Sequence, residues 1–145
     1  MDPNNKYSTK YLDVPNTPLY PFGYGLSYTT FNYGDIMLSS STLRPGQTLT
    51  ATITVTNTGK IEGTETVQLY LRDVVGSISR PVKELKGFEL VELKKGETKT
   101  VTMTLTDKEL GFFDNDGNYL VEAGTFKIMV GGSSDKGLES SFVLE

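Results

Sequence analysis

The sequence contains no cysteine, no histidine and no tryptophan in its 145 residues. Without cysteine the chain can form no disulfide, thiolate nucleophile or zinc finger, and without histidine it has no imidazole base. These absences exclude Ser-His-Asp and Cys-His catalysis and the usual transition-metal sites. We therefore expect neither a metal nor a cofactor.

Positive charge and long apolar runs are also scarce. The chain has 14 Lys and Arg against 18 Asp and Glu, a formal net charge of -4, whereas a nucleic-acid or anionic-membrane partner requires a concentrated basic face. No apolar run approaches the roughly 20 residues that span a bilayer, and residues 1–5 lack the layout of a secretory signal. We expect a soluble, single-domain chain with no nucleic-acid and no membrane partner.

Aromatic residues gather at the N-terminal end of the chain, together with proline and glycine. Of the 8 Tyr and 7 Phe, eight lie in the first 33 positions. Proline and glycine at this density forbid a helix and interrupt any long strand. We predict an extended, irregular arm over residues 1–30 and one folded domain over residues 31–145.

The residues after position 31 alternate between apolar and polar side chains, with the period of a half-buried β-strand. Between positions 48 and 56, four apolar side chains from Leu49 to Val55 alternate with five threonines. Strands are predicted over residues 31–39, 48–57, 64–73, 84–93, 97–106, 118–122, 125–131 and 139–144, and one helical turn over residues 106–110. The side chains predicted to face inward are Leu49, Ile53, Val55, Val67, Leu69, Leu71, Val101, Met103, Leu105, Phe126, Ile128 and Val130.

Turn residues separate these runs, and the spacing predicts an all-β, antiparallel β-sandwich. The stretch DNDG at residues 114–117 is similar to part of a calcium loop, but Phe112 would then occupy the first ligand position. A hairpin turn with Gly117 at a positive φ is the favoured interpretation.

The residues alone leave carbohydrate chemistry open. A glycosidase needs two carboxylates across a sugar, and among eighteen acidic residues some pair meets that distance by chance. The number of acidic residues therefore indicates neither the presence nor the absence of a glycosidase site. Tyr70 could be a sugar-stacking platform, because it alternates with the inward-facing Leu69 and Leu71, but a place in a second layer or at an interface is favoured.

Several long motifs resemble one family in their order and spacing. They are PLYPFGYGLSYTTF at residues 18–31, VTNTG at 55–59, GTETVQLYL at 63–71, RPVKELKGF at 80–88, GET at 96–98, GTF at 124–126 and VGGSS at 130–134. Over residues 7–145 the chain resembles the C-terminal fibronectin type III-like domain of glycoside hydrolase family 3 enzymes, typically β-glucosidases. The resemblance implies a fibronectin type III or immunoglobulin-like β-sandwich preceded by the irregular aromatic arm.

The resemblance implies no catalytic residue in this chain. In the family the nucleophile is an aspartate in a Ser-Asp-aromatic motif of a separate barrel domain, and the acid/base glutamate comes from a following α/β domain. Here Ser134-Asp135 is the only Ser-Asp pair, and Lys136 follows it. We predict a parent enzyme, periplasmic or secreted, that hydrolyses β-D-glucosides without a metal, and no catalysis by this chain.

The predicted role of the chain is structural, as a domain that packs on and supports the catalytic domains of the same parent chain. The aromatic arm is the predicted contact, because exposed rings need a cover. Three alternatives stay open. The arm completes the sandwich's own core, the arm joins two copies of the chain, or the domain is a carbohydrate-binding module that tethers the enzyme to polysaccharide. The suspected interdomain contacts are Tyr20, Phe22, Tyr24 and Tyr28.

Overall fold

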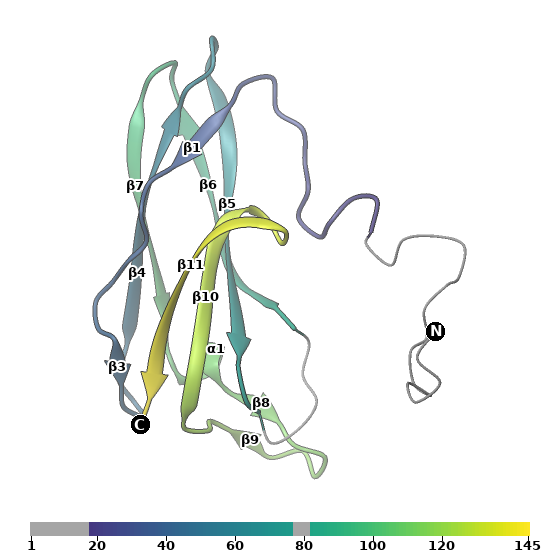
Figure 1. Cartoon of the computed structure of the whole chain (residues 1–145), viewed down its shortest axis with the longest axis vertical. Helices are drawn as coiled ribbons and strands as arrows, with labels where there is room; N and C mark the ends of the chain where they lie inside the picture. The colour runs from purple at the N-terminus through teal and green to yellow at the C-terminus, as the bar shows by residue number, and fades with distance from the viewer. Residues whose placement is uncertain (1–17, 77–81) are drawn as a thin grey trace, which may run out of the picture.

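The computed structural model describes residues 18–76 and 82–145, in which two β-sheets pack face to face (Figure 1). In the four-stranded sheet, β4 (Leu49–Asn57) lies between β7 (Thr98–Leu105) and the two short strands β1 (Phe31–Tyr33) and β2 (Met37–Leu38). The five-stranded sheet has the order β3 (Thr42–Leu43), β11 (Lys136–Leu144), β10 (Gly124–Ser133), β5 (Gly63–Asp73) and β6 (Glu84–Leu93). The predicted all-β sandwich is confirmed.

The core lies between the two sheets and consists of the inward-facing side chains of the long strands. Along β4 every second residue is buried, from Leu49 to Asn57, because side chains alternate across a strand. Of the twelve side chains predicted to face inward, eleven are buried, and Met103 is partly buried against the core. The predicted register is therefore confirmed. The core also contains Leu43, Ala51, Val91, Leu93, Leu110, Phe142 and Leu144.

The outer face of the four-stranded sheet carries threonines. On β4 and β7 they form directly opposed pairs, two of which approach within hydrogen-bond distance: Thr52 and Thr102 at 3.4 Å, and Thr56 and Thr98 at 2.7 Å between hydroxyl oxygens. Threonine suits such a position because it is β-branched and still presents a hydroxyl to water. We call this surface the threonine face; it consists of Thr50, Thr52, Thr54, Thr56, Thr98, Thr100, Thr102 and Thr104.

The predicted continuous strand over residues 31–39 is wrong. Tyr33 pairs with Val55, whereas Met37 pairs with Thr52. From one pair to the next the chain advances four residues in this segment but only three residues in β4. The extra residue is the signature of a β-bulge, and it divides the segment into β1 and β2. The sequence also gave no sign of β3, whose pairing with β11 is the one parallel pairing among the described strands.

A small hairpin and one helical turn connect β7 to β10. The turn α1 (Asp107–Leu110) is capped by Thr106, which forms a capping box with Glu109, and it lies within the helical turn predicted over residues 106–110. The strand expected over residues 118–122 is shorter, and it pairs as β9 (Tyr119–Leu120) with the unpredicted β8 (Phe112–Phe113). Gly117 has a φ of 83° in the turn between them, as predicted.

No helix in residues 18–76 and 82–145 is long and apolar enough to cross a membrane. Among the same residues, no group of three or more acidic side chains could hold a metal ion.

Candidate interaction site

Two polar side chains are buried on the outer face of the five-stranded sheet. Gln68 and Tyr70 point outward from β5, because they alternate with the core residues Val67, Leu69 and Leu71. Even so, only 4% of Gln68 and 2% of Tyr70 is exposed. Burial raises the pKa of the Tyr70 hydroxyl, and the Asp135 charge adds to the effect. An outward face this well covered must have a second layer above it.

The arm provides that layer. The Gln68 amide donates to the carbonyl oxygens of Gly23 and Gly132 at 3.0 and 2.7 Å, and the Tyr70 hydroxyl donates to Gln68 Oε1 at 2.5 Å. The Ser134 amide, in the turn between β10 and β11, donates to the Phe22 carbonyl at 2.9 Å. Figure 1 shows the arm running from β1 toward this turn. Its backbone is thus fixed to the sheet by hydrogen bonds.

Gly23 is required where the arm meets the sheet. Its φ is 77°, a conformation that side chains rarely adopt, and a Cβ atom built there would overlap Gln68 Oε1. The Tyr24 amide closes the local turn by donating to the Pro21 carbonyl at 3.0 Å. The Gly and Pro residues that forbade a helix therefore shape a turn that brings the arm's backbone onto Gln68.

The aromatic side chains of residues 18–28 are largely exposed, although the backbone of this segment is docked. Tyr20, Phe22 and Tyr24 are exposed, and Tyr28 is 98% exposed. Tyr20 and Tyr24 pack on each other with ring centroids 5.2 Å apart, and Phe22 meets the Tyr70 ring edge to face at 6.5 Å. Within the described part of the arm, residues 18–30, no side chain belongs to the core between the sheets, and residues 1–17 of the predicted arm lie outside the described residues. Contact of these four residues with another domain stays a prediction.

The other end of the arm is attached through Asn57, a residue that the sequence analysis did not single out. The buried Thr29 hydroxyl donates to Asn57 Oδ1 at 2.7 Å, and the Gly59 amide donates to the same oxygen at 3.0 Å. The Asn57 amide donates to the carbonyls of Ile61 and Leu93 at 2.8 and 3.0 Å. Asn57 is fully buried and joins the arm, β4 and β6. Its place in the motif VTNTG was the only signal.

Tyr70 is not a sugar-stacking platform, and the favoured alternative is correct. Its ring lies in the second layer beneath Phe22, and its hydroxyl is engaged with Gln68. A pyranose ring could not reach either face of a side chain that is 2% exposed. Sequence alternation correctly placed Tyr70 on the outer face, but it could not show that the arm covers that face.

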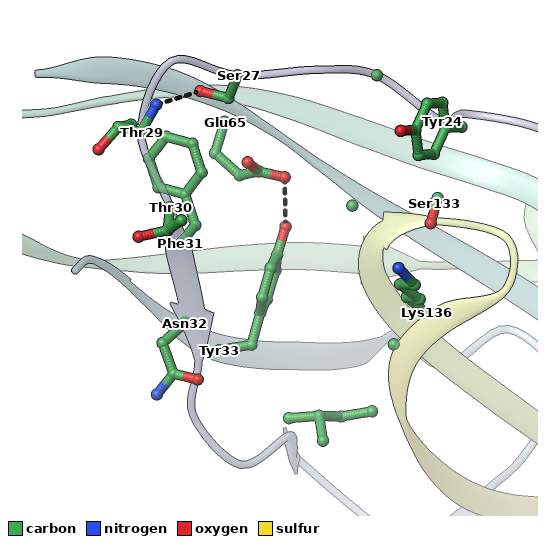
Figure 2. A pocket seen from close by; sticks show the side chains of 14 residues that line it. Tyr24, Ser27, Thr29, Thr30, Phe31, Asn32, Tyr33, Glu65, Ser133 and Lys136 are labelled. Atoms are coloured by element: carbon green, nitrogen blue, oxygen red, sulfur yellow. Dashed lines mark hydrogen bonds between the residues drawn. The ribbon is translucent and has the colours of Figure 1, made fainter. Parts of the chain in front are cut away.

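An open hollow of about 600 Å³ lies between the arm, β1 and the β10–β11 turn (Figure 2). Tyr33 extends from β1 and donates its hydroxyl to Glu65 Oε1 of β5 at 2.8 Å, while Ser133 and Lys136 line the opposite side. Burial raises the pKa of Glu65, an effect partly opposed by the hydrogen bond from Tyr33, and it raises the pKa of Tyr33 strongly. The pair links the two sheets at the edge of the sandwich.

Ser134 and Asp135 lie in the turn between β10 and β11, as predicted. Ser133 donates to the Asp135 carboxylate at 2.7 Å, which stabilises the turn. The location is that of a structural turn and not of a buried nucleophile.

Comparison with known proteins identifies the fold. The model of the fibronectin type III-like domain matches residues 65–134, from β5 to the β10–β11 turn. The sandwich therefore has the fold of a fibronectin type III-like domain. The β-glucosidase from Listeria innocua, solved in complex with isofagomine, superimposes on this domain with a TM-score of 0.89 and 42% identity, over 99% of this chain and 20% of that one.

Curated relatives of this fibronectin type III-like domain are glycosidases. The periplasmic β-glucosidase of Salmonella typhimurium is 49% identical over 97% of this chain and 18% of its own length. A β-xylosidase of Formosa agariphila is 51% identical over 86% of this chain and 17% of its own length. The chain therefore spans less than a fifth of the curated relatives it matches, in which such a domain is part of a much longer chain.

Proposed function

We propose that this fibronectin type III-like domain is the non-catalytic C-terminal domain of a glycoside hydrolase family 3 β-glucosidase. In the proposal the arm is residues 1–30, the sandwich is residues 31–145, and both pack on the catalytic domains of the same chain. The parent enzyme would hydrolyse β-D-glucosides. A periplasmic or secreted parent is supported by the name of the Salmonella relative. The proposed interdomain contacts are Tyr20, Phe22, Tyr24 and Tyr28.

One observation carries the proposal: the arm holds exposed aromatic rings on a backbone that is already fixed. Gln68 and Ser134 hydrogen bond to the arm's carbonyl groups, while Tyr20 and Phe22 remain exposed. A fixed backbone loses little further conformational entropy when its side chains bind a partner. Each aromatic ring can bury about 150–250 Å² in such a contact. This combination suits a preorganised docking element better than a core element.

Support of this kind matters for a glycosidase whose catalytic groups come from different domains. A displacement of about 1 Å between reacting groups can reduce a rate about a hundredfold. A third domain that contacts the catalytic domains can restrict their relative movement. If the contact between this domain and the catalytic domains is weakened, we expect the enzyme to lose activity faster at elevated temperature.

A chimera tests the proposal. This chain replaces the matching segment of the Salmonella β-glucosidase, and Phe22→Ser is compared with Phe113→Ser. Phe22 and Phe113 are a matched pair because each is 67% exposed, but Phe113 lies on β8, away from the arm. We expect Phe22→Ser to shorten the half-life of activity at elevated temperature and Phe113→Ser to leave it unchanged. Equal half-lives for the two variants would contradict docking through the arm.

The isolated chain provides two further controls. Phe22→Ser should change the free energy of unfolding of the isolated chain by no more than about 1 kcal/mol, since among the described residues the ring makes one aromatic contact, with Tyr70. The isolated chain should not hydrolyse an aryl β-glucoside and should release no heat on titration with glucan oligomers. Turnover would overturn the non-catalytic assignment, and saturable heat would show a carbohydrate-binding module instead.

A further inference from the structure

The two outer faces of the sandwich differ in chemistry. The threonine face of the four-stranded sheet presents hydroxyl groups, which remain satisfied in water. The outer face of the five-stranded sheet presents Phe88 and Leu90 at its β6 edge, 65% and 64% exposed. Exposed apolar groups lose free energy in water. The β6 edge therefore favours a partner more than the threonine face does, where Met37, opposite Thr52, is exposed among hydroxyl groups.

Strand register places Phe88 and Leu90 on the same face as the docked arm. Phe88 pairs with Gln68 and Leu90 pairs with Thr66, so both point to the side that Gln68 shares with Tyr70. Leu85 pairs with Tyr70 beyond an irregularity in the ladder, and it also points to this side. These β6 side chains therefore extend the surface that begins at the arm.

The arm and β6 are joined by a shallow hollow of about 440 Å³. Phe22 of the arm lines one part, Tyr70 lies at its base, and Val82 and Leu85 line another part beside Lys83. Lys83 reaches across the sheet to the Ser134 carbonyl at 3.2 Å, which holds the segment before β6 against the β10–β11 turn. We call the continuous apolar region the arm–β6 surface; it consists of Phe22, Val82, Leu85, Phe88 and Leu90.

We propose that the arm–β6 surface is the face by which this domain packs on the catalytic part of its own chain, and that the threonine face stays in water. The inference rests on the proposed function and adds the orientation of the domain. It also predicts an apolar complementary surface on the catalytic domains, because the exposed side chains of β6 at this surface, Leu85, Phe88 and Leu90, offer no hydrogen-bonding group.

Three observations favour this occupant. Similar sequences lie in chains more than five times as long, so a covalently attached partner is available in such proteins. The core between the sheets consists of other residues, so Phe88 and Leu90 do not contribute to it. Three of the five side chains of the surface, Val82, Leu85 and Leu90, can neither stack flat on a pyranose nor bond its hydroxyl groups, so the surface fits an apolar protein face better than a polysaccharide. Uncovered apolar patches larger than a few hundred Å² are unusual on a monomer.

The test again uses the chimera with the Salmonella enzyme. Phe88→Ser with Leu90→Ser is compared with Phe113→Ser, and Thr100→Glu with Thr102→Glu probes the threonine face. We expect the β6 pair to shorten the half-life of activity about tenfold, a change typical of two well-buried interface residues. The Thr→Glu pair and Phe113→Ser should leave the half-life unchanged. Hydrogen exchange should also be slower in β6 of the chimera than in β6 of the isolated chain.

Each outcome decides between the faces or the occupants. If Phe22→Ser shortens the half-life and the β6 pair does not, the proposed function stands and this orientation is wrong. If the threonine-face pair shortens it instead, the opposite orientation is correct. Sedimentation of the isolated chain as a dimer that the β6 pair dissociates would make a second copy the occupant. Variants of the isolated chain with unchanged circular dichroism show that misfolding is not the cause.

Discussion

Tyr33 of β1 donates its hydroxyl to Glu65 of β5 at 2.8 Å, and this bond joins the two sheets at the open edge of the sandwich. The carboxylate loses hydration there, so burial raises its pKa above the ordinary value. The folded state therefore holds the Glu65 proton more tightly than the unfolded state does. The free energy of unfolding therefore depends on pH through Glu65.

Glu65→Gln should reduce that dependence. A raised folded-state pKa means that Glu65 stabilises the fold most below its ordinary pKa, and that this stabilisation is lost as pH rises through the folded-state pKa. Glutamine keeps an oxygen for the Tyr33 hydroxyl but never ionises. In urea unfolding, the free energy of unfolding of Glu65→Gln relative to that of the wild type should be higher at pH 7 than at pH 4. Tyr33→Phe should steepen the dependence on pH, since it removes a bond that favours the carboxylate.

Truncation of the core should be costly at the positions where alternation and burial agree. Ile53 and Leu69 come from different sheets and are 2% and 1% exposed. Replacing either by alanine should lower the free energy of unfolding by about 2–5 kcal/mol, because the cavity left behind adds to the lost burial. Thr102→Ala on the threonine face is the control and should stay within about 0.5 kcal/mol. Comparable losses at all three positions would argue against this register.

Asn57→Ala should destabilise the chain more than an ordinary polar truncation. The substitution removes the partners of the Thr29 hydroxyl and the Gly59 amide, together with the donor to Leu93. Buried groups without partners cost about 1–3 kcal/mol each. We expect a loss of at least about 2 kcal/mol in denaturant unfolding. Thr58→Ala, at the exposed neighbouring position, should lower the free energy of unfolding much less. Equal losses for the two variants would show that the buried hydrogen bonds of Asn57 do not stabilise the fold.

The sequence predicted what depends on local periodicity and missed what depends on distant partners. Alternation placed β4 and its threonines correctly because a strand with one buried face has one possible register. The buried pair of Gln68 and Tyr70 was not predictable in the same way, because its cover comes from Gly23, about 45 residues earlier in the chain. The bulge between β1 and β2 was missed although Gly34 lies directly after β1, where an added Cβ would overlap Thr54 Oγ1. Glycine inside a strand often marks a bulge, so the signal was present and not used.

The attachment of the arm to the sheet can be tested at Gly23. Alanine there would combine a positive φ with an overlap between its Cβ and Gln68 Oε1, so the arm should detach from β5. Detachment would expose Tyr70 and leave the Gln68 amide in water. We expect faster hydrogen exchange at residues 22–24 and faster iodination or nitration of Tyr70 than in the wild type. The free energy of unfolding should fall by about 1–3 kcal/mol.

Gly25→Ala is the matched control for Gly23→Ala. Gly25 lies two residues further along the same arm, but it lacks a positive φ and its Cβ would meet nothing within 4 Å. It should therefore keep Tyr70 protected and the unfolding free energy unchanged or slightly raised, because alanine restricts the unfolded chain. If both variants left Tyr70 protected, the hydrogen bonds of Gln68 would not be what holds the arm. In the chimera, Gly23→Ala should also shorten the half-life of activity, since the rings of Tyr20 and Phe22 would lose their fixed backbone.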